Sequence, residues 1–231
     1  KVVAFIYADG ADVFACGVEA LKALDELEAL ASPLDPLTRQ RIMRDRIVLG
    51  TPEGPYSSEE QRELLLEALH LTAPNFDPDN IEQFRYTQEE TGLINQLAIT
   101  YAQSGESHKA ISIYRQLLHY IQKNNRQLSR YATQLTMVAL NYAIELDRAG
   151  WYEDALEVAE TGQKVCLEYD CHQFHPELLH VMAECFHFLD DNVESKRLYT
   201  QAYYLYTSFR EKHNLERLIV DAQEQLGLAF E

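Results

Sequence analysis

Residues 143–159 read AIELDRAGWYEDALEVA, two amphipathic stretches that meet at Gly150. Ala143 stands seven residues before this glycine and Ala155 five residues after it. Two helices can pack closely where small side chains face each other, and a glycine between them permits a tight reversal of the chain. The stretch therefore predicts an antiparallel pair of helices.

The same spacing of small residues recurs on either side of this stretch. The matching positions are Ala98, Gly105 and Ala110 in AITYAQSGESHKAISIY (98–114), and Ala183, Asp190 and Ser195 in AECFHFLDDNVESKRLY (183–199). In the last copy, aspartate replaces the turn glycine and serine the second alanine. Because one hairpin cannot bury its apolar faces alone, we expect neighbouring hairpins to stack along the chain.

The remaining sequence is also helical in pattern, without the alternation of apolar and polar residues that a strand requires. Capping boxes at Ser57/Glu60 and Thr87/Glu90 begin two of the helices. We expect helices over 12–30, 36–49, 58–72, 88–103, 106–124, 129–149, 151–169, 176–189, 192–211 and 213–229. The predicted fold is all-α, a right-handed superhelix (α-solenoid) of about five helical hairpins.

Composition limits the classes of function. The chain has 231 residues and a net charge of −17, with 16 acids and 8 bases in residues 1–86 and 21 acids and 12 bases in residues 87–231. Neither part is basic enough to bind phosphate backbones unaided. No apolar run approaches the ~18 residues of a membrane span, and four cysteines are too few for a disulfide scaffold. We expect a cytoplasmic protein with reduced cysteines.

The Ala/Gly/Ala spacing with aromatic residues between resembles the tetratricopeptide repeat (TPR) family over residues 91–205. The units follow one another after 45 and 40 residues, longer than the usual ~34. Long units of this kind resemble the regulatory domains of Rgg/PlcR-type transcriptional regulators, which carry a helix-turn-helix of the xenobiotic-response-element class. Residues 64–118 are similar to the middle of such regulators. LNYAIEL at 140–146 is similar to the stretch in which that family places a peptide-binding asparagine, here Asn141.

The resemblance implies divergent TPR-like hairpins over 1–86 and TPR-like repeats with a C-terminal capping helix over 87–231. It also implies an upstream DNA-binding helix-turn-helix, which is absent here because residues 1–31 contain no basic recognition helix. The chain begins with Lys1 rather than Met, so we expect it to be part of a longer protein. Its implied function is to sense a ligand for a transcriptional regulator, the ligand being a quorum-sensing peptide.

Residues of the concave wall are the candidates for ligand contact, because the first helix of each hairpin lines that wall in a superhelix. Asparagine and glutamine can donate to and accept from a peptide backbone at once, and arginine can pair with a carboxylate. The candidate peptide-binding residues are Asn141, Asn95, Gln96, Arg148, His180, Glu184 and His187. The ligand would be a short peptide or a protein tail.

The amphipathic helix expected at 213–229 has an apolar side. Its members are Leu215, Leu218, Ile219, Ala222 and Leu226. An uncovered apolar side favours a homodimer, whereas a covered one would only cap its own chain.

We expect no metal, no cofactor and no enzymatic activity. CLEYDCHQFHPELLHVMAECFHF (166–188) holds three Cys and four His but no C-x-x-C or H-x-x-x-H pair. His180 and His187, two turns apart, could share an ion only with Glu184 between them. Nucleophile-elbow and P-loop motifs are absent from the sequence.

Two other functions compete with peptide sensing. One is a TPR scaffold for protein–protein interaction with no role in DNA binding. The other is a peptide-regulated phosphatase or response-regulator inhibitor, which would need an N-terminal three-helix bundle where residues 1–50 offer at most two helices.

Overall fold

The computed structural model describes residues 22–26, 34–49, 56–124, 128–209 and 212–230. Its helices are α2 (Pro36–Leu49), α3 (Ser58–Thr72), α4 (Gln88–Gln103), α5 (Ser107–Asn124), α6 (Leu128–Arg148), α7 (Tyr152–Glu168), α8 (His175–Phe188), α9 (Asn192–Phe209) and α10 (Lys212–Leu226), with short 3₁₀ helices η2 (Ile81–Gln83) and η3 (His172–Phe174). These ranges contain no β-strand, which confirms the all-α prediction. The helix predicted at 12–30 lies outside the described residues except for 22–26, which are helical.

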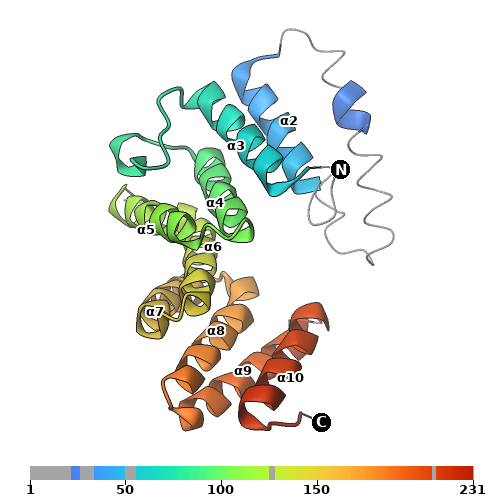
Figure 1. Cartoon of the computed structure of the whole chain (residues 1–231), viewed down its shortest axis with the longest axis vertical. Helices are drawn as coiled ribbons and strands as arrows, with labels where there is room; N and C mark the ends of the chain where they lie inside the picture. Colours follow the sequence, from blue (N-terminus) through green and yellow to red (C-terminus); the bar gives the residue numbers. More distant parts are fainter. Residues whose placement is uncertain (1–21, 27–33, 50–55, 125–127, 210–211, 231) are drawn as a thin grey trace. The chain divides into compact units, whose positions relative to one another are not determined.

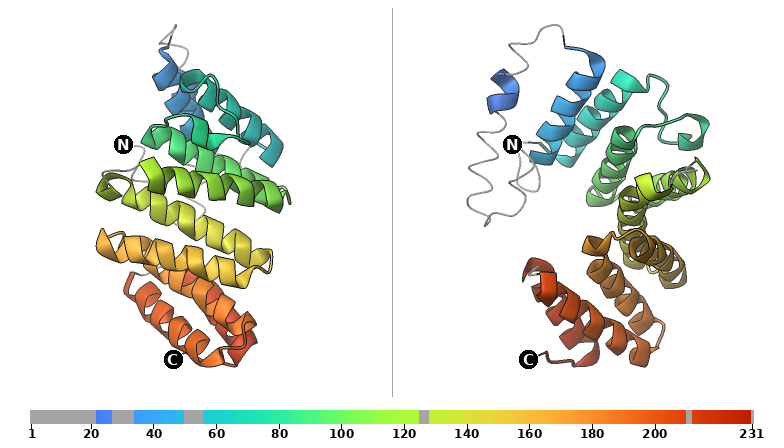
Figure 2. Two further views of the ribbon diagram at one scale, coloured as in Figure 1. Left: turned by 90° about the vertical axis from the view of Figure 1, so that its left-hand side faces the viewer. Right: turned by 180° about the vertical axis from the view of Figure 1, so that it is seen from behind.

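The chain divides into two compact units, residues 1–106 and 107–231. In the first unit α3 packs between α2 and α4, and in the second α5 to α10 pack against one another in chain order (Figures 1 and 2). The division falls between α4 and α5. The domain boundary expected between residues 86 and 87 is a different one, at the start of α4, and it stays a prediction.

Capping and interior polar contacts hold the first unit together. Both predicted capping boxes are present, at Ser57/Glu60 before α3 and Thr87/Glu90 before α4. The Thr72 hydroxyl accepts a 2.5 Å hydrogen bond from the Gln40 amide and donates a 2.6 Å bond to the Glu90 carboxylate. These partly buried bonds tie α2, α3 and α4 together and leave the buried side chains of Gln40 and Glu90 with hydrogen-bond partners.

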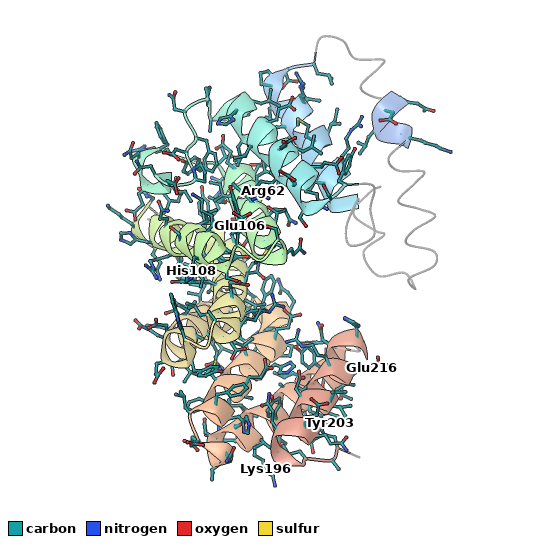
Figure 3. All side chains as sticks on the ribbon, in the orientation of Figure 1. Arg62, Glu106, His108, Lys196, Tyr203 and Glu216 are labelled. Atoms are coloured by element: carbon teal, nitrogen blue, oxygen red, sulfur yellow. The ribbon has the colours of Figure 1, made fainter. Side chains whose placement is uncertain are left out.

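One arginine joins α3 to the turn after α4. The Arg62 guanidinium donates a 2.5 Å hydrogen bond to Glu106 (Figure 3). The central carbon of the guanidinium lies 4.6 Å from the centre of the Tyr101 ring. A cation over an aromatic face gains electrostatic attraction as well as packing.

The three turns aligned from the sequence share one hydrogen-bond pattern. The central residues have positive φ: +80° at Gly105, +78° at Gly150 and +64° at Asp190. After them the backbone N–H groups of Glu106, Trp151 and Asp191 donate to the carbonyls of Tyr101, Leu146 and Phe186, each at 2.9 Å. This is the Schellman C-cap, in which a left-handed residue lets the chain close the end of a helix. The predicted equivalence of the three turns is confirmed.

The small residues of the repeat lie in the interior. The exposed fraction is 0% for Ala98, Ala110, Ala143, Ala155, Ala183 and Ser195. The Ser195 hydroxyl donates a 2.7 Å bond to the carbonyl of Ala183 on the facing helix. The serine therefore replaces alanine without leaving a buried hydroxyl unpaired.

A close approach of α7 to both of its neighbours requires Gly162. A Cβ atom at this position would lie 3.0 Å from the Cβ of Ala139 on α6 and 3.1 Å from a methyl of Leu178 on α8. Gly162 has no counterpart in the Ala/Gly/Ala spacing, and its role was not predicted from the sequence.

Helix α10 covers α8 and α9. Leu218 and Ala222 on its apolar side are 0% exposed, and the Tyr199 hydroxyl of α9 donates a 2.9 Å bond to Gln225. The centre of the apolar side therefore packs within its own chain, while Leu215, Ile219 and Leu226 are half-buried, and a homodimer stays a prediction. No helix in the described ranges is long and apolar enough to cross a membrane.

Candidate functional site

Five of the seven predicted peptide-binding residues lie in the second unit. Asn141 and Arg148 belong to α6, and His180, Glu184 and His187 to α8. The other two, Asn95 and Gln96, belong to α4 in the first unit, where Asn95 is 3% exposed and Gln96 is half-buried. A side chain as buried as Asn95 could touch a ligand only if its surroundings moved, and its role stays a prediction.

On α6 the polar residues differ in exposure. Asn141 is half-buried and Arg148 is exposed, with 65% of its side chain accessible. Glu145, between them on the same face, is 3% exposed and lies 3.6 Å from the Arg148 guanidinium. Glu145 is thus a buried partner that positions Arg148, whose remaining N–H groups face solvent and can meet a ligand carboxylate.

On α8, His180 is buried and fixed by α10. Its Nε2 lies 2.9 Å from Oδ2 of Asp221, and its ring packs against Tyr199 at 5.6 Å and Tyr206 at 6.5 Å between centroids. Burial lowers the pKa of His180, so the ring is neutral at pH 7. Burial would raise the pKa of Asp221, but the hydrogen bond with His180 and the charge of Arg217, 3.6 Å away, outweigh it, so the pKa is lowered. A neutral ring beside a carboxylate carries its proton on Nε2, which donates to Asp221.

Three carboxylates of three helices lie near one another, because Asp147 and Asp221 both act on Glu184. They are Asp147 of α6, Glu184 of α8 and Asp221 of α10, and we call them the carboxylate cluster. Burial, followed by repulsion from Asp147 and Asp221, raises the pKa of Glu184 to about 7. Burial also raises the pKa of Asp147. The charged groups that act on Glu184 are Asp147 and Arg148 from α6 and Arg217 and Asp221 from α10.

Cys185 contacts the carboxylate cluster, whereas His187 does not. The Cys185 thiol donates to Asp147 at 3.5 Å, and burial beside that carboxylate raises the pKa of the thiol, so it remains protonated. His187 lies 2.9 Å from the side-chain oxygen of Asn192, at the start of α9. The structure therefore brings His180 and Glu184 together with Asp221, while His187 pairs elsewhere. Cys166, Cys171 and Cys185 are free thiols as predicted, and Cys16 lies outside the described residues.

Sequence reasoning missed Asp147, Arg217 and Asp221. Asp221 lies 41 residues from His180, and nothing in a single sequence pairs two helices at that separation. The available signal was the four-residue spacing of Arg217 and Asp221, which places both on one helix face and brings them to 3.6 Å.

The sequence over residues 59–225 matches the RNPP family C-terminal domain. The chain belongs to the RNPP family. The predicted Rgg/PlcR-type resemblance is thereby confirmed for most of this domain. No curated protein matches the chain by sequence.

Solved structures support the fold of this RNPP domain. PlcR of Bacillus thuringiensis in its apo form is 17% identical, with a TM-score of 0.67 over 90% of this chain and 75% of that chain. PlcR in complex with the peptide PapR7 and DNA is 14% identical, with a TM-score of 0.53 over 93% and 76%. TPR-like repeats of a kinesin light chain from Podosopora anserina are 17% identical, with a TM-score of 0.59 over 84% and 88%. At these identities the likeness shows the fold alone, an α-solenoid of TPR-like hairpins, as predicted.

Proposed function

We propose that this RNPP domain is the cytoplasmic, peptide-sensing regulatory domain of a transcriptional regulator. The observation that carries the proposal is the family match over residues 59–225. The similarity in fold to PlcR, which has been solved with a peptide and DNA, supports the same role. DNA would be contacted through a separate helix-turn-helix domain, and the role is regulatory rather than catalytic.

The peptide would lie across α6 and α8. The Asn141 amide is half-buried and can donate to a peptide carbonyl while it accepts from a peptide N–H. The exposed Arg148 guanidinium would bind a carboxylate of the peptide. Glu184 and His187 are half-buried side chains of α8 within the proposed contact area.

Regulation requires that the peptide bind one packing of the helices better than another. A ligand that contacts both α6 and α8 would favour the packing in which both contacts are made. The resulting change would pass to the DNA-binding domain or to the dimer of the full-length regulator. A change in helix packing of this kind requires no catalysed reaction in the domain.

Calorimetric titration of the domain with a pool of synthetic short peptides tests the proposal. We expect saturable binding that weakens about tenfold or more in Asn141→Ala, because a buried amide partner of the peptide backbone is lost. Gln116→Ala is the matched control, since Gln116 is a half-buried amide on the neighbouring α5 that bonds to Ser112. This control is expected to bind as tightly as wild type.

The same titration distinguishes a different peptide site and the scaffold function from the proposal. Binding to Asn141→Ala that is as tight as to wild type would place the peptide away from Asn141. No binding of any pool peptide would contradict peptide sensing and favour the interaction scaffold.

A further inference from the structure

His180, Glu184 and Asp221 form a compact group of potential metal ligands. One ligand atom from each residue lies within 4.8 Å of the others. His180 and Glu184 stand one turn apart on α8, so both point to the same side of the helix. Asp221 reaches the group from α10. Two rigid helices therefore supply the three side chains.

The distances suit one small ion after a modest adjustment. Zinc binds histidine nitrogen and carboxylate oxygen at about 2.1 Å, which places two ligands of a tetrahedral site about 3.4 Å apart. The Nε2 of His180 and Oδ2 of Asp221 are already 2.9 Å apart. Only Glu184 must approach, and it is the member with freedom to do so, because it makes no hydrogen bond or ion pair within the described part of the chain.

The charge in this region also favours a cation. The carboxylates of Asp147 and Asp221 both repel that of Glu184 in a partly buried setting. Arg217 offsets part of this charge, but its Nε is 3.6 Å from Asp221 and its side chain is 49% exposed. An exposed guanidinium can turn towards water when a divalent ion takes its place.

We propose that His180, Glu184 and Asp221 bind a divalent transition-metal ion of the zinc type. A donor set of one imidazole and two carboxylates matches zinc, whereas calcium and magnesium prefer oxygen ligands alone. Three protein ligands leave one position of a tetrahedral site for water. The ion would take the place of the proton on Nε2 of His180, and the neutral ring would carry that proton on Nδ1 instead.

Such an ion would link α8 to α10, 41 residues apart in the chain. A ligand that binds only the folded state stabilises it in proportion to the logarithm of its concentration over Kd. The metal site shares Glu184 with the proposed peptide contact area. Because the ion is added to the peptide-free domain, failure of the metal proposal and failure of the peptide proposal are distinguishable.

Titration of the metal-free domain with zinc chloride at neutral pH tests the site, by calorimetry and by the shift in Tm. We expect one ion per chain and a rise in Tm. Glu184→Gln and Asp221→Asn remove one ligand each and are expected to weaken binding by about tenfold or more. Both variants keep the shape of the side chain, and each removes a negative charge from the cluster, so folding is preserved.

Asp170→Asn is the matched control. Asp170 also lies beside a histidine nitrogen, 3.1 Å from Nε2 of His172, but the pair is exposed and is not part of a three-ligand group in the described ranges. We expect the control to bind zinc like wild type. Cobalt(II) should compete with zinc and give visible absorption that disappears in Glu184→Gln. Equal zinc binding in all four proteins, or none in wild type, would overturn the proposal.

Discussion

Asp190 adopts the left-handed backbone conformation that glycine adopts in the two preceding turns, with φ of +64°. A side chain in this region is strained, and aspartate tolerates it better than most residues. Asp190→Gly is therefore expected to raise the free energy of unfolding by about 0.5–1 kcal/mol, and Asp190→Ala to lower it by a similar amount. Urea denaturation measures both. If Asp190→Gly were less stable than wild type, the contacts of the aspartate side chain would stabilise the fold by more than its left-handed backbone conformation destabilises it.

Glu184 has a raised folded-state pKa of about 7, against an ordinary value of 4.5. Between these pH values the folded state keeps the proton while the unfolded chain loses it. The stability that protonated Glu184 contributes is thus complete below about pH 4.5 and is lost as the pH rises through 7. Glu184→Gln, which cannot ionise, should gain about 1–3 kcal/mol over wild type across this range in metal-free buffer.

Denaturation at a series of pH values measures this difference. Exposed Glu216, on α10, gives the control Glu216→Gln, which should track wild type at every pH (Figure 3). A constant gap between Glu184→Gln and wild type would show that the carboxyl titrates normally.

Helix α7 depends on Gly162 for its approach to α6 and α8. Gly162→Val would force branched methyl groups against Ala139 and Leu178, and we expect it to lower stability by about 1–3 kcal/mol. Gly92 in α4 is the comparison, because a Cβ atom there would meet nothing within 4 Å. Gly92→Ala should be neutral or stabilising by up to about 1 kcal/mol. Thermal unfolding of both variants measures the contrast, and equal effects would contradict a close helix contact at Gly162.

The helices could be predicted from sequence because local chemistry marks their ends. Capping boxes begin α3 and α4, and left-handed turn residues end α4, α6 and α8. The burial of Ala143 and Ser195 followed from their spacing alone. Gly162 could not be found in this way, because its role depends on two helices that approach it from both sides.

The candidate site was only partly predictable, because some of its contacts join helices that are far apart in the sequence. His180 and Glu184 share a helix face, so their proximity follows from spacing. The partner of His180 is Asp221, which depends on how α10 packs against α8. His187, placed on the same face by sequence, instead pairs with Asn192 at the next turn.

The candidate polar residues of the second unit lie on α6 and α8, two helices that contact each other. A net charge of −17 disfavours direct contact with nucleic acid and favours neutral or basic ligands. Together with membership of the RNPP family over 59–225, these properties support the proposal of a peptide-sensing regulatory domain.

Hydrogen–deuterium exchange of the domain, with and without a peptide selected from the pool, tests this account most directly. Exchange slows where a ligand suppresses local opening. The account predicts slower exchange in α6 around 141–148 and in α8 around 180–187. Protection confined to α7 and α9, or no protection at saturating peptide, would contradict it.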